Sequence, residues 1–215
     1  IVFGDWSSDV CSSDLLEGPR RRILPESQLL PGWLKPRPDP LSLGKRRLWT
    51  GLRALARGIP PLRGWHAQQL RKFAVATVCA EDVILFADSD MLFLRPFDVT
   101  SLSDDGAVRL YRKPDAITAD MARHVPWCTH ASALLGLDAP TFPSPDYINN
   151  LVSWRRDHVL ALLDHVESVS GRDWVSAIAR ERHFSEYLIY GYFVERVLGL
   201  EAAGHPVFVQ GRDGS

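Results

Sequence analysis

Apolar positions along this chain recur with helical spacing in some segments and run without interruption in others. Residues 65–79 and 157–168 place apolar side chains three and four positions apart, as on one face of a helix. Residues 83–88 instead form a short apolar run rich in β-favouring side chains, which predicts a strand buried within a sheet. Helices that alternate with apolar strands predict an α/β fold with a mainly parallel sheet flanked by helices.

Glycine and proline positions divide the rest of the chain into further elements. We predict helices at 46–57, 129–135, 173–181 and 185–198, and strands at 108–111 and 147–154. Gly136, Gly171 and Gly199 follow three of the predicted helices and are expected to end them.

The first residues of the chain resemble a translated adapter sequence and not part of a protein domain. Residues 5–15 read DWSSDVCSSDL, and one reading frame of a common short-read sequencing adapter encodes this string through Asp14. We therefore expect residues 1–15 to be a non-native, disordered leader and residues 16–215 to be a single domain that is incomplete at its N-terminus. A native Ser/Asp-rich disordered leader is the alternative, whereas a signal peptide would need a basic start and a continuous apolar core.

Composition is that of a globular domain, with 46% hydrophobic residues and a formal net charge of −1. No apolar stretch is long enough to span a bilayer, so we expect a cytoplasmic protein. Arginine and lysine nevertheless crowd residues 20–63. A solvated basic face, attraction to a diphosphate and peripheral contact with an anionic membrane remain open explanations. Nucleic acid is not an expected partner, because no nucleic-acid-binding motif is present.

The end of the predicted strand at 83–88 carries the clearest chemical signal. Asp88 and Asp90 are two positions apart, so a strand presents both carboxylates on one face while Ser89 points away. Two such carboxylates repel unless a cation or a basic group lies between them. A divalent ion that takes its other ligands from water and a diphosphate would suit the pair. Capping of a turn by the two side chains is the alternative interpretation.

The segment FADSDMLFLRP at residues 86–96 resembles the DxD region of GT-A-type glycosyltransferases. QQLRK at residues 68–72 is similar to a pattern in a bacterial family thought to contain glycosyltransferases. The resemblance implies a GT-A-like (Rossmann-like) domain in which Asp88 and Asp90 hold Mn²⁺ or Mg²⁺ against the diphosphate of a nucleotide-sugar donor. The acceptor would be a glycan, a lipid-linked compound or another hydroxyl compound.

Further substrate-binding candidates flank the DxD motif. Gln68, Gln69 and Lys72 lie on the helix before it, where the lysine could neutralise donor phosphate. A solvent-facing side of an amphipathic helix would explain the same three residues. Asn149 and Asn150 lie in the predicted strand that is similar to the family's post-DxD strand, and one of them should point into the site.

The start of the last predicted helix supplies the catalytic candidate. Related inverting transferases place a carboxylate at such a helix start, which implies that Glu186 could deprotonate the acceptor hydroxyl. Helix capping by Ser185 and a favourable helix-dipole position for Glu186 are the simpler explanation. Tyr190 follows one turn later and could line the same cleft, with aromatic core packing as its alternative.

The sequence thus favours a metal-dependent glycosyltransferase. A metal-dependent phosphotransferase or phosphohydrolase is the first alternative, although the chain has no glycine-rich phosphate loop. A non-catalytic carbohydrate-binding module that retains the fold is the second.

Overall fold

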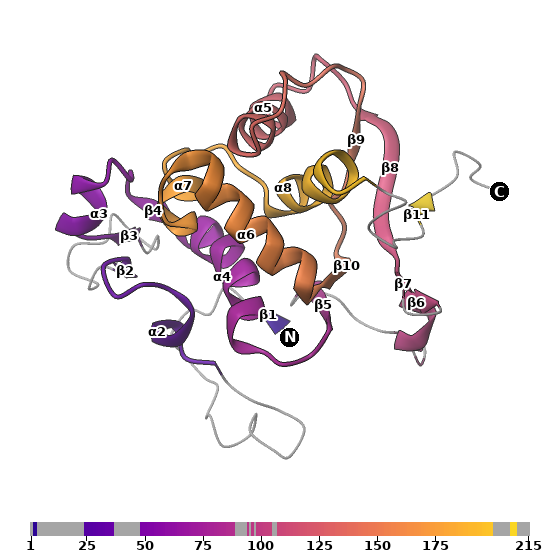
Figure 1. Ribbon diagram of the computed structural model, residues 1–215, viewed down its shortest axis with the longest axis horizontal. Helices are drawn as coiled ribbons and strands as arrows, with labels where there is room; N and C mark the ends of the chain where they lie inside the picture. The colour runs from indigo at the N-terminus through magenta and orange to yellow at the C-terminus, as the bar shows by residue number, and fades with distance from the viewer. Residues whose placement is uncertain are drawn as a thin grey trace.

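The computed structural model describes residues 2–3, 24–36, 48–88, 94, 96, 98–104, 107–199 and 207–209. In these residues the chain forms a mixed α/β fold, which confirms the predicted fold class in its broad form (Figure 1). The helices are α2 (Glu26–Leu29), α3 (Leu52–Ala56), α4 (Gly64–Val78), α5 (His124–Leu134), α6 (Arg156–Ser170), α7 (Trp174–Ala179) and α8 (Glu186–Tyr192). A 3₁₀ helix spans Val99–Leu102, and a π-helix, Phe193–Val197, continues α8.

The strands are short and form several small sheets. They are β1 (Val2–Phe3), β2 (Lys35–Pro36), β3 (Leu48–Thr50), β4 (Leu62–Arg63), β5 (Val83–Asp88), β6 (Ser103–Asp104), β7 (Ala107–Val108), β8 (Leu110–Ile117), β9 (Ser144–Asp146), β10 (Leu151–Arg155) and β11 (Val207–Val209). Their orders are β1–β5–β10, β11–β8–β9 and β2–β3–β4, with β6 and β7 paired separately.

The expectation of a mainly parallel sheet is wrong for the described pairings. Only β1–β5 and β11–β8 are parallel, whereas the other five pairings are antiparallel. A parallel neighbour needs a crossover that returns the chain to the end of the sheet where the first strand began. The chain instead leaves β5 at its carboxyl end, passes through β8, α5 and β9, and enters β10 at that carboxyl end, where Leu151 pairs with Ala87.

Strand β1 falls within residues 1–15, which were expected to be disordered. Val2 is paired with Ala87 and Phe3 with Asp88 in a parallel arrangement. The edge of β5 offers these two residues partners for backbone pairing. The adapter-like string at residues 5–15 lies outside the described part of the chain.

An aromatic stack fills the core between α4, β10 and α8. The Trp154 ring stacks on Tyr190 with centroids 4.6 Å apart and on Phe73 at 5.4 Å. Phe86 of β5 meets the same indole edge-on at 4.7 Å. These rings join two helices to the two antiparallel strands, so the end of β5 is built on a rigid base.

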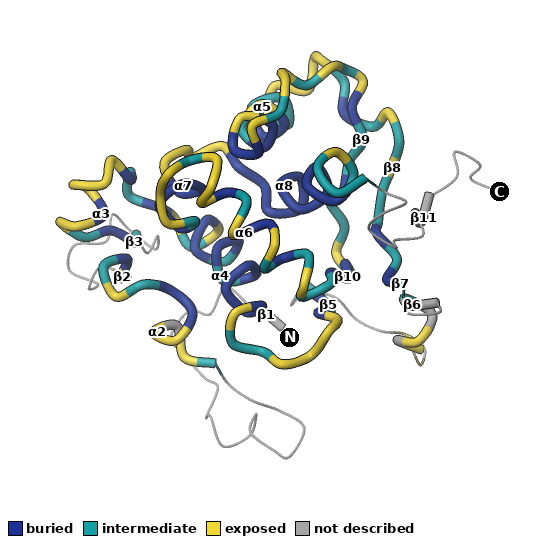
Figure 2. The backbone as a smooth tube through the Cα atoms, in the orientation of Figure 1, coloured by how far each residue is buried: buried dark blue, intermediate teal, exposed yellow. Residues whose placement is uncertain are grey.

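Helix α8 is the most central helix of the fold. All seven of its residues are buried, and it contacts both α4 and α5 (Figure 2). Gly191 lets α8 approach the loop before β10, because a Cβ at this position would lie 2.2 Å from Cγ of Tyr147. The Tyr147 hydroxyl donates to Glu195 of the π-helix, whose carboxylate also pairs with Arg112 of β8 at 2.7 Å.

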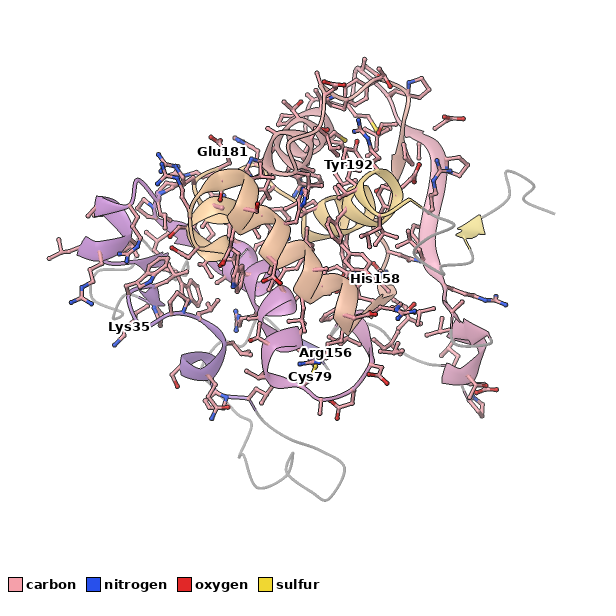
Figure 3. All side chains as sticks on the ribbon, in the orientation of Figure 1. Lys35, Cys79, Arg156, His158, Glu181 and Tyr192 are labelled. Atoms are coloured by element: carbon pink, nitrogen blue, oxygen red, sulfur yellow. The ribbon has the colours of Figure 1, made fainter. Side chains whose placement is uncertain are left out.

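The two helices predicted from apolar spacing are confirmed, and they pack on each other. Helix α4 matches residues 65–79, although Thr77, one turn after the buried Phe73, is exposed. Helix α6 buries an apolar stripe of Val159, Leu162, Leu163 and Val166 and ends at Gly171, which has a φ of 63°. At the far end of the pair, Arg156 donates to the carbonyl of Ala76 at 2.9 Å and lies close to Cys79 (Figure 3).

Three other predicted elements differ from the structure. The predicted helix at 46–57 is divided into β3 and α3, because residues 48–50 pair with β2 and β4. The strand predicted at 147–154 begins only at Leu151. The helix predicted at 185–198 changes from α to π geometry at Phe193. Among the described residues, no helix combines the length and the apolar character needed to cross a bilayer.

Candidate functional site

The candidate site is built around the carboxyl end of β5. Helix α4 leads into β5 through a short connection and therefore runs back along the strand, which brings its middle beside Asp88. Lys72 Nζ lies 3.9 Å from Asp88 Oδ1. The Asp88 side chain is 35% exposed, whereas that of Lys72 is 6% exposed. The strand end thus offers an accessible carboxylate with a buried cation beneath it.

Lys72 is held by the first turn of α8. Its Nζ donates to Glu186 Oε1 at 2.8 Å and to the Tyr187 hydroxyl at 2.6 Å. The Glu186 side chain is 5% exposed. A buried ammonium is tolerated only when it is paired and hydrogen-bonded, and these two partners meet that requirement. The pairing links positions 114 residues apart in the chain.

Gln69 fixes the start of α8 from the neighbouring turn of α4. Its Oε1 accepts from the backbone N–H of Glu186 at 3.0 Å. Ser185 occupies the predicted N-cap position, but its side chain makes no capping bond, so Gln69 satisfies the helix terminus in its place. Gln69 Nε2 is buried and has no hydrogen-bond partner among the described residues. This amide therefore presents a spare donor beside Lys72.

Electrostatics keep Lys72 and Tyr187 protonated at neutral pH. Burial alone would lower the pKa of Lys72, but the charge of Glu186 and the oxygen of Tyr187 raise it to about 12. Burial, reinforced by the Glu186 charge, also raises the pKa of Tyr187 to about 12. Burial raises the pKa of Glu186, and the ion pair with Lys72 opposes that change. In this cluster of Gln69, Lys72, Asp88, Glu186 and Tyr187, the Lys72 ammonium therefore stays charged, and its charge is balanced by the Glu186 carboxylate.

The two asparagines lie in the loop before β10 rather than within the strand. The backbone N–H of Asp88 donates to the carbonyl of Asn150 at 3.0 Å, so this loop closes against the end of β5. Asn149 Oδ1 accepts from the N–H of Asn150 at 2.8 Å, which stabilises the local turn. The Asn150 residue is exposed next to Asp88, as a substrate contact would require.

Three predicted site residues are not part of this cluster as described. Asp90 lies outside the described residues. Gln68 is half-buried and lies about 100° around α4 from Gln69. Tyr190 is fully buried, and its hydroxyl accepts from the N–H of Arg155 at 3.0 Å, so it belongs to the core rather than to a cleft.

His66 ties the start of α4 to the segment that leads into α8. Its Nδ1 accepts from the N–H of Arg63 at 3.2 Å, so the ring proton lies on Nε2, which donates to the Arg182 carbonyl at 2.9 Å. The ring also packs on Phe184 with centroids 5.6 Å apart. Burial lowers the pKa of His66. A neutral histidine thus fixes the segment of chain that leads to Glu186 against the start of α4.

Tyr187 is the member of the cluster that sequence reasoning missed. A tyrosine inside an apolar helix resembles a core residue, and Tyr187 is indeed only 6% exposed. Its position directly after the candidate carboxylate Glu186 was the available signal. The described residues contain no group of three or more His, Cys, Asp or Glu side chains arranged to hold a metal. A cation at Asp88 would therefore need Asp90 or ligands from a substrate.

Comparison with known proteins gives the chain a family but no activity. No curated protein and no solved structure matches the sequence. A model of a family of unknown function matches residues 9–205, which include all the described residues of the cluster. Because this match spans most of the sequence, the chain belongs to the DUF6492 family.

Proposed function

We propose that this protein is a metal-dependent glycosyltransferase that moves a sugar from a nucleotide-diphosphate donor to a hydroxyl acceptor. The observation that carries the proposal is the meeting of an accessible carboxylate, Asp88, with a buried cation, Lys72, at one strand end. Gln69 adds a buried amide donor without a described partner. Oxygen ligands for a cation beside N–H donors for phosphate are the two features that a metal–diphosphate complex requires.

Mn²⁺ or Mg²⁺ would be held by Asp88 together with Asp90. A strand-end carboxylate that is one-third exposed suits an ion that keeps waters and binds substrate phosphates. When bound, the metal would supply Lewis acidity to the diphosphate leaving group. Lys72 would add positive charge beside the same phosphate. The chain's own residues thus bind and orient the donor.

In the proposed transferase, the β1–β5–β10 sheet would be the centre of a GT-A-like domain. A parallel strand on one side of β5 and an antiparallel strand on the other leave the Asp88 end open to solvent. Ligands of α/β folds bind at such carboxyl ends of strands. The proposed transferase would act in the cytoplasm on a hydroxyl acceptor, as expected from the sequence.

Replacing Asp88 with asparagine is expected to weaken Mn²⁺-dependent binding of UDP or GDP by at least tenfold, roughly the lower limit for disturbing a metal site. Isothermal titration of both nucleotides, with and without Mn²⁺, measures the effect. Asp138→Asn, an exposed carboxylate on another loop, is the matched control and should bind like the wild type. Equal Mn²⁺-dependent affinity in the Asp88 variant, or no nucleotide binding by the wild type, would overturn the proposal.

Glu186 is proposed to act through Lys72. Its carboxylate is buried and holds Nζ at 2.8 Å, which leaves Nζ 3.9 Å from Asp88. Without the Glu186 charge, Lys72 would move toward Asp88 and compete with the metal for that carboxylate. Glu186 is therefore a positioning residue in this proposal, whereas the resemblance to inverting transferases implied that it could act as a general base.

We expect Glu186→Gln to reduce Mn²⁺-dependent nucleotide affinity by about fivefold, the effect of a coupling near 1 kcal/mol. The general-base role predicts unchanged nucleotide affinity together with a roughly hundredfold loss of transfer or donor hydrolysis. Nucleotide titration and turnover measured on the same variant therefore separate the two roles. Retained affinity with lost turnover would assign Glu186 to the acceptor hydroxyl.

A further inference from the structure

Helix α3 presents apolar side chains to solvent. It connects β3 to β4 and lies at one edge of the molecule, where most of its residues are exposed (Figure 2). Leu52 is 88% exposed, the highest value among the large apolar side chains that the structure describes, and Leu55 is 48% exposed. The two leucines are three positions apart and therefore form one ridge, whereas α3 buries Ala54. Because covering apolar surface is favourable, this ridge favours contact with an apolar partner.

Positive charge surrounds the leucine ridge. Arg53 and Arg57 lie four positions apart on the adjacent face of α3, and both are exposed. Exposed Arg180 donates from Nη1 to the carbonyl of Arg57 at 3.3 Å, which places a third guanidinium at the end of α3. Exposed Lys35 of β2 is paired with Thr50, just before α3. We call the two leucines and these four cations the α3 face.

The charge of the α3 face is not neutralised by neighbouring carboxylates. Among the residues that the structure describes, none of the four cations forms an ion pair. Asp39 is the only acidic residue between positions 27 and 80 of the sequence. Glu181 follows Arg180 in the chain but lies far from Lys35 (Figure 3). The α3 face therefore keeps an excess of positive charge.

Capping of α3 explains only part of this arrangement. Arg57 donates from Nη1 to the carbonyl of Arg53 at 3.1 Å, and its guanidinium lies 4.9 Å from the ring centroid of Trp33. Cations near the C-terminal end of a helix are favourable by themselves. A guanidinium has five N–H donors, however, so a bond to one carbonyl leaves donors and the full charge for an anionic group. Capping also gives no reason for two exposed leucines on the same helix.

We infer that the α3 face binds the surface of an anionic lipid bilayer. Leu52 and Leu55 enter the boundary between headgroups and acyl chains, while the four cations extend to the lipid phosphates. A second copy of this chain is disfavoured on this face, because it would bring like charges together. A nucleic acid would match the charge but not the leucines, since its exposed bases stack on aromatic side chains. The inference does not depend on the proposed transferase.

Sedimentation with lipid vesicles tests the inference. The full chain should bind vesicles of phosphatidylglycerol and phosphatidylcholine in equal parts, and added NaCl should weaken that binding. Binding to pure phosphatidylcholine should be much weaker, because that lipid has no net charge. Leu52→Ala should weaken binding to the anionic vesicles about tenfold, the scale of losing a partly immersed leucine. Arg53→Gln combined with Arg57→Gln should weaken it about 25-fold, the product of about fivefold for each cation.

Two variants away from α3 are the matched controls. Met121→Ala changes an apolar side chain that is 37% exposed in the turn before α5. Lys113→Gln changes an exposed cation on β8, on the opposite side of the molecule from α3 (Figure 1). Both should bind anionic vesicles like the wild type. All of the substituted side chains are exposed, so every variant should also keep the wild-type Tm.

Several results would overturn the inference. They are a wild type that does not bind anionic vesicles, equal binding to pure phosphatidylcholine, and unchanged binding by Leu52→Ala. A loss with Lys113→Gln as large as with the arginine double variant would show attraction without a defined face. A dimer in light scattering that Leu52→Ala dissociates would assign the leucines to a second copy. Vesicle binding requires neither a nucleotide nor a metal, so it can fail or succeed independently of the nucleotide titrations.

Discussion

Replacing Lys72 with methionine is expected to lower the free energy of unfolding by about 3–5 kcal/mol, because the buried Glu186 carboxylate loses its cation. Urea denaturation at pH 8 measures the loss. Without Lys72, the pKa of Glu186 in the folded protein rises further above its unfolded value. Protonation of Glu186 then favours the folded state. The difference in the free energy of unfolding between Lys72→Met and the wild type should therefore shrink as the pH falls toward the ordinary pKa of glutamate.

The double variant Lys72→Met with Glu186→Gln separates the cost of an unpaired charge from the loss of packing. Removing both charges should recover most of the lost stability, since no ion is then left buried alone. Lys35→Met changes an exposed lysine and should alter stability by less than about 0.5 kcal/mol. A Lys72→Met protein as stable as the wild type would show that the pair contributes nothing to the fold.

Gly191→Ala is expected to destabilise the protein by roughly 3 kcal/mol, the upper range for overpacking a core. The new Cβ would overlap the Tyr147 ring at 2.2 Å, and the bond from Tyr147 to Glu195 prevents that ring from moving aside. Thermal and urea unfolding measure the loss. Gly32→Ala is the control, because its Cβ would meet only Lys35 Cε at 4.0 Å. A gain in stability, as expected from helix propensity alone, would contradict the packing argument.

Local patterns predicted the elements whose apolar residues face one core. Helices α4 and α6 and strand β5 lie within three residues of their predicted ends, because spacing along the chain records which face is buried. The segment 46–57 was predicted wrongly because β3 exists through pairing with β2 and β4, which no local pattern encodes. Residues 147–150 were extended into a strand, whereas Asn150 is needed as a loop contact to Asp88.

The candidate site was only partly predictable for a related reason. Gln69, Lys72, Asp88 and Glu186 were selected from three separate segments, and the structure brings all four together. Their mutual contacts could not be predicted, because the Lys72–Glu186 pair joins distant helices. For Tyr190, spacing of one turn from Glu186 was compatible with a shared cleft or with aromatic core packing. The structure has the core packing, because all residues of α8 are buried.

The complete burial of α8 also bears on how this fold can diversify. Every substitution in α8 must conserve volume on all sides of the helix, so accepted changes there should be few and small. The start of α4, the exposed end of α5 and the Asn149–Asn150 turn have open surroundings, and changes there cost little stability. Natural variation should therefore preserve the Lys72–Glu186 pair, while new ligand preferences arise from substitutions in these exposed segments. A common ancestor could in this way have given rise to proteins with one inner scaffold and many specificities.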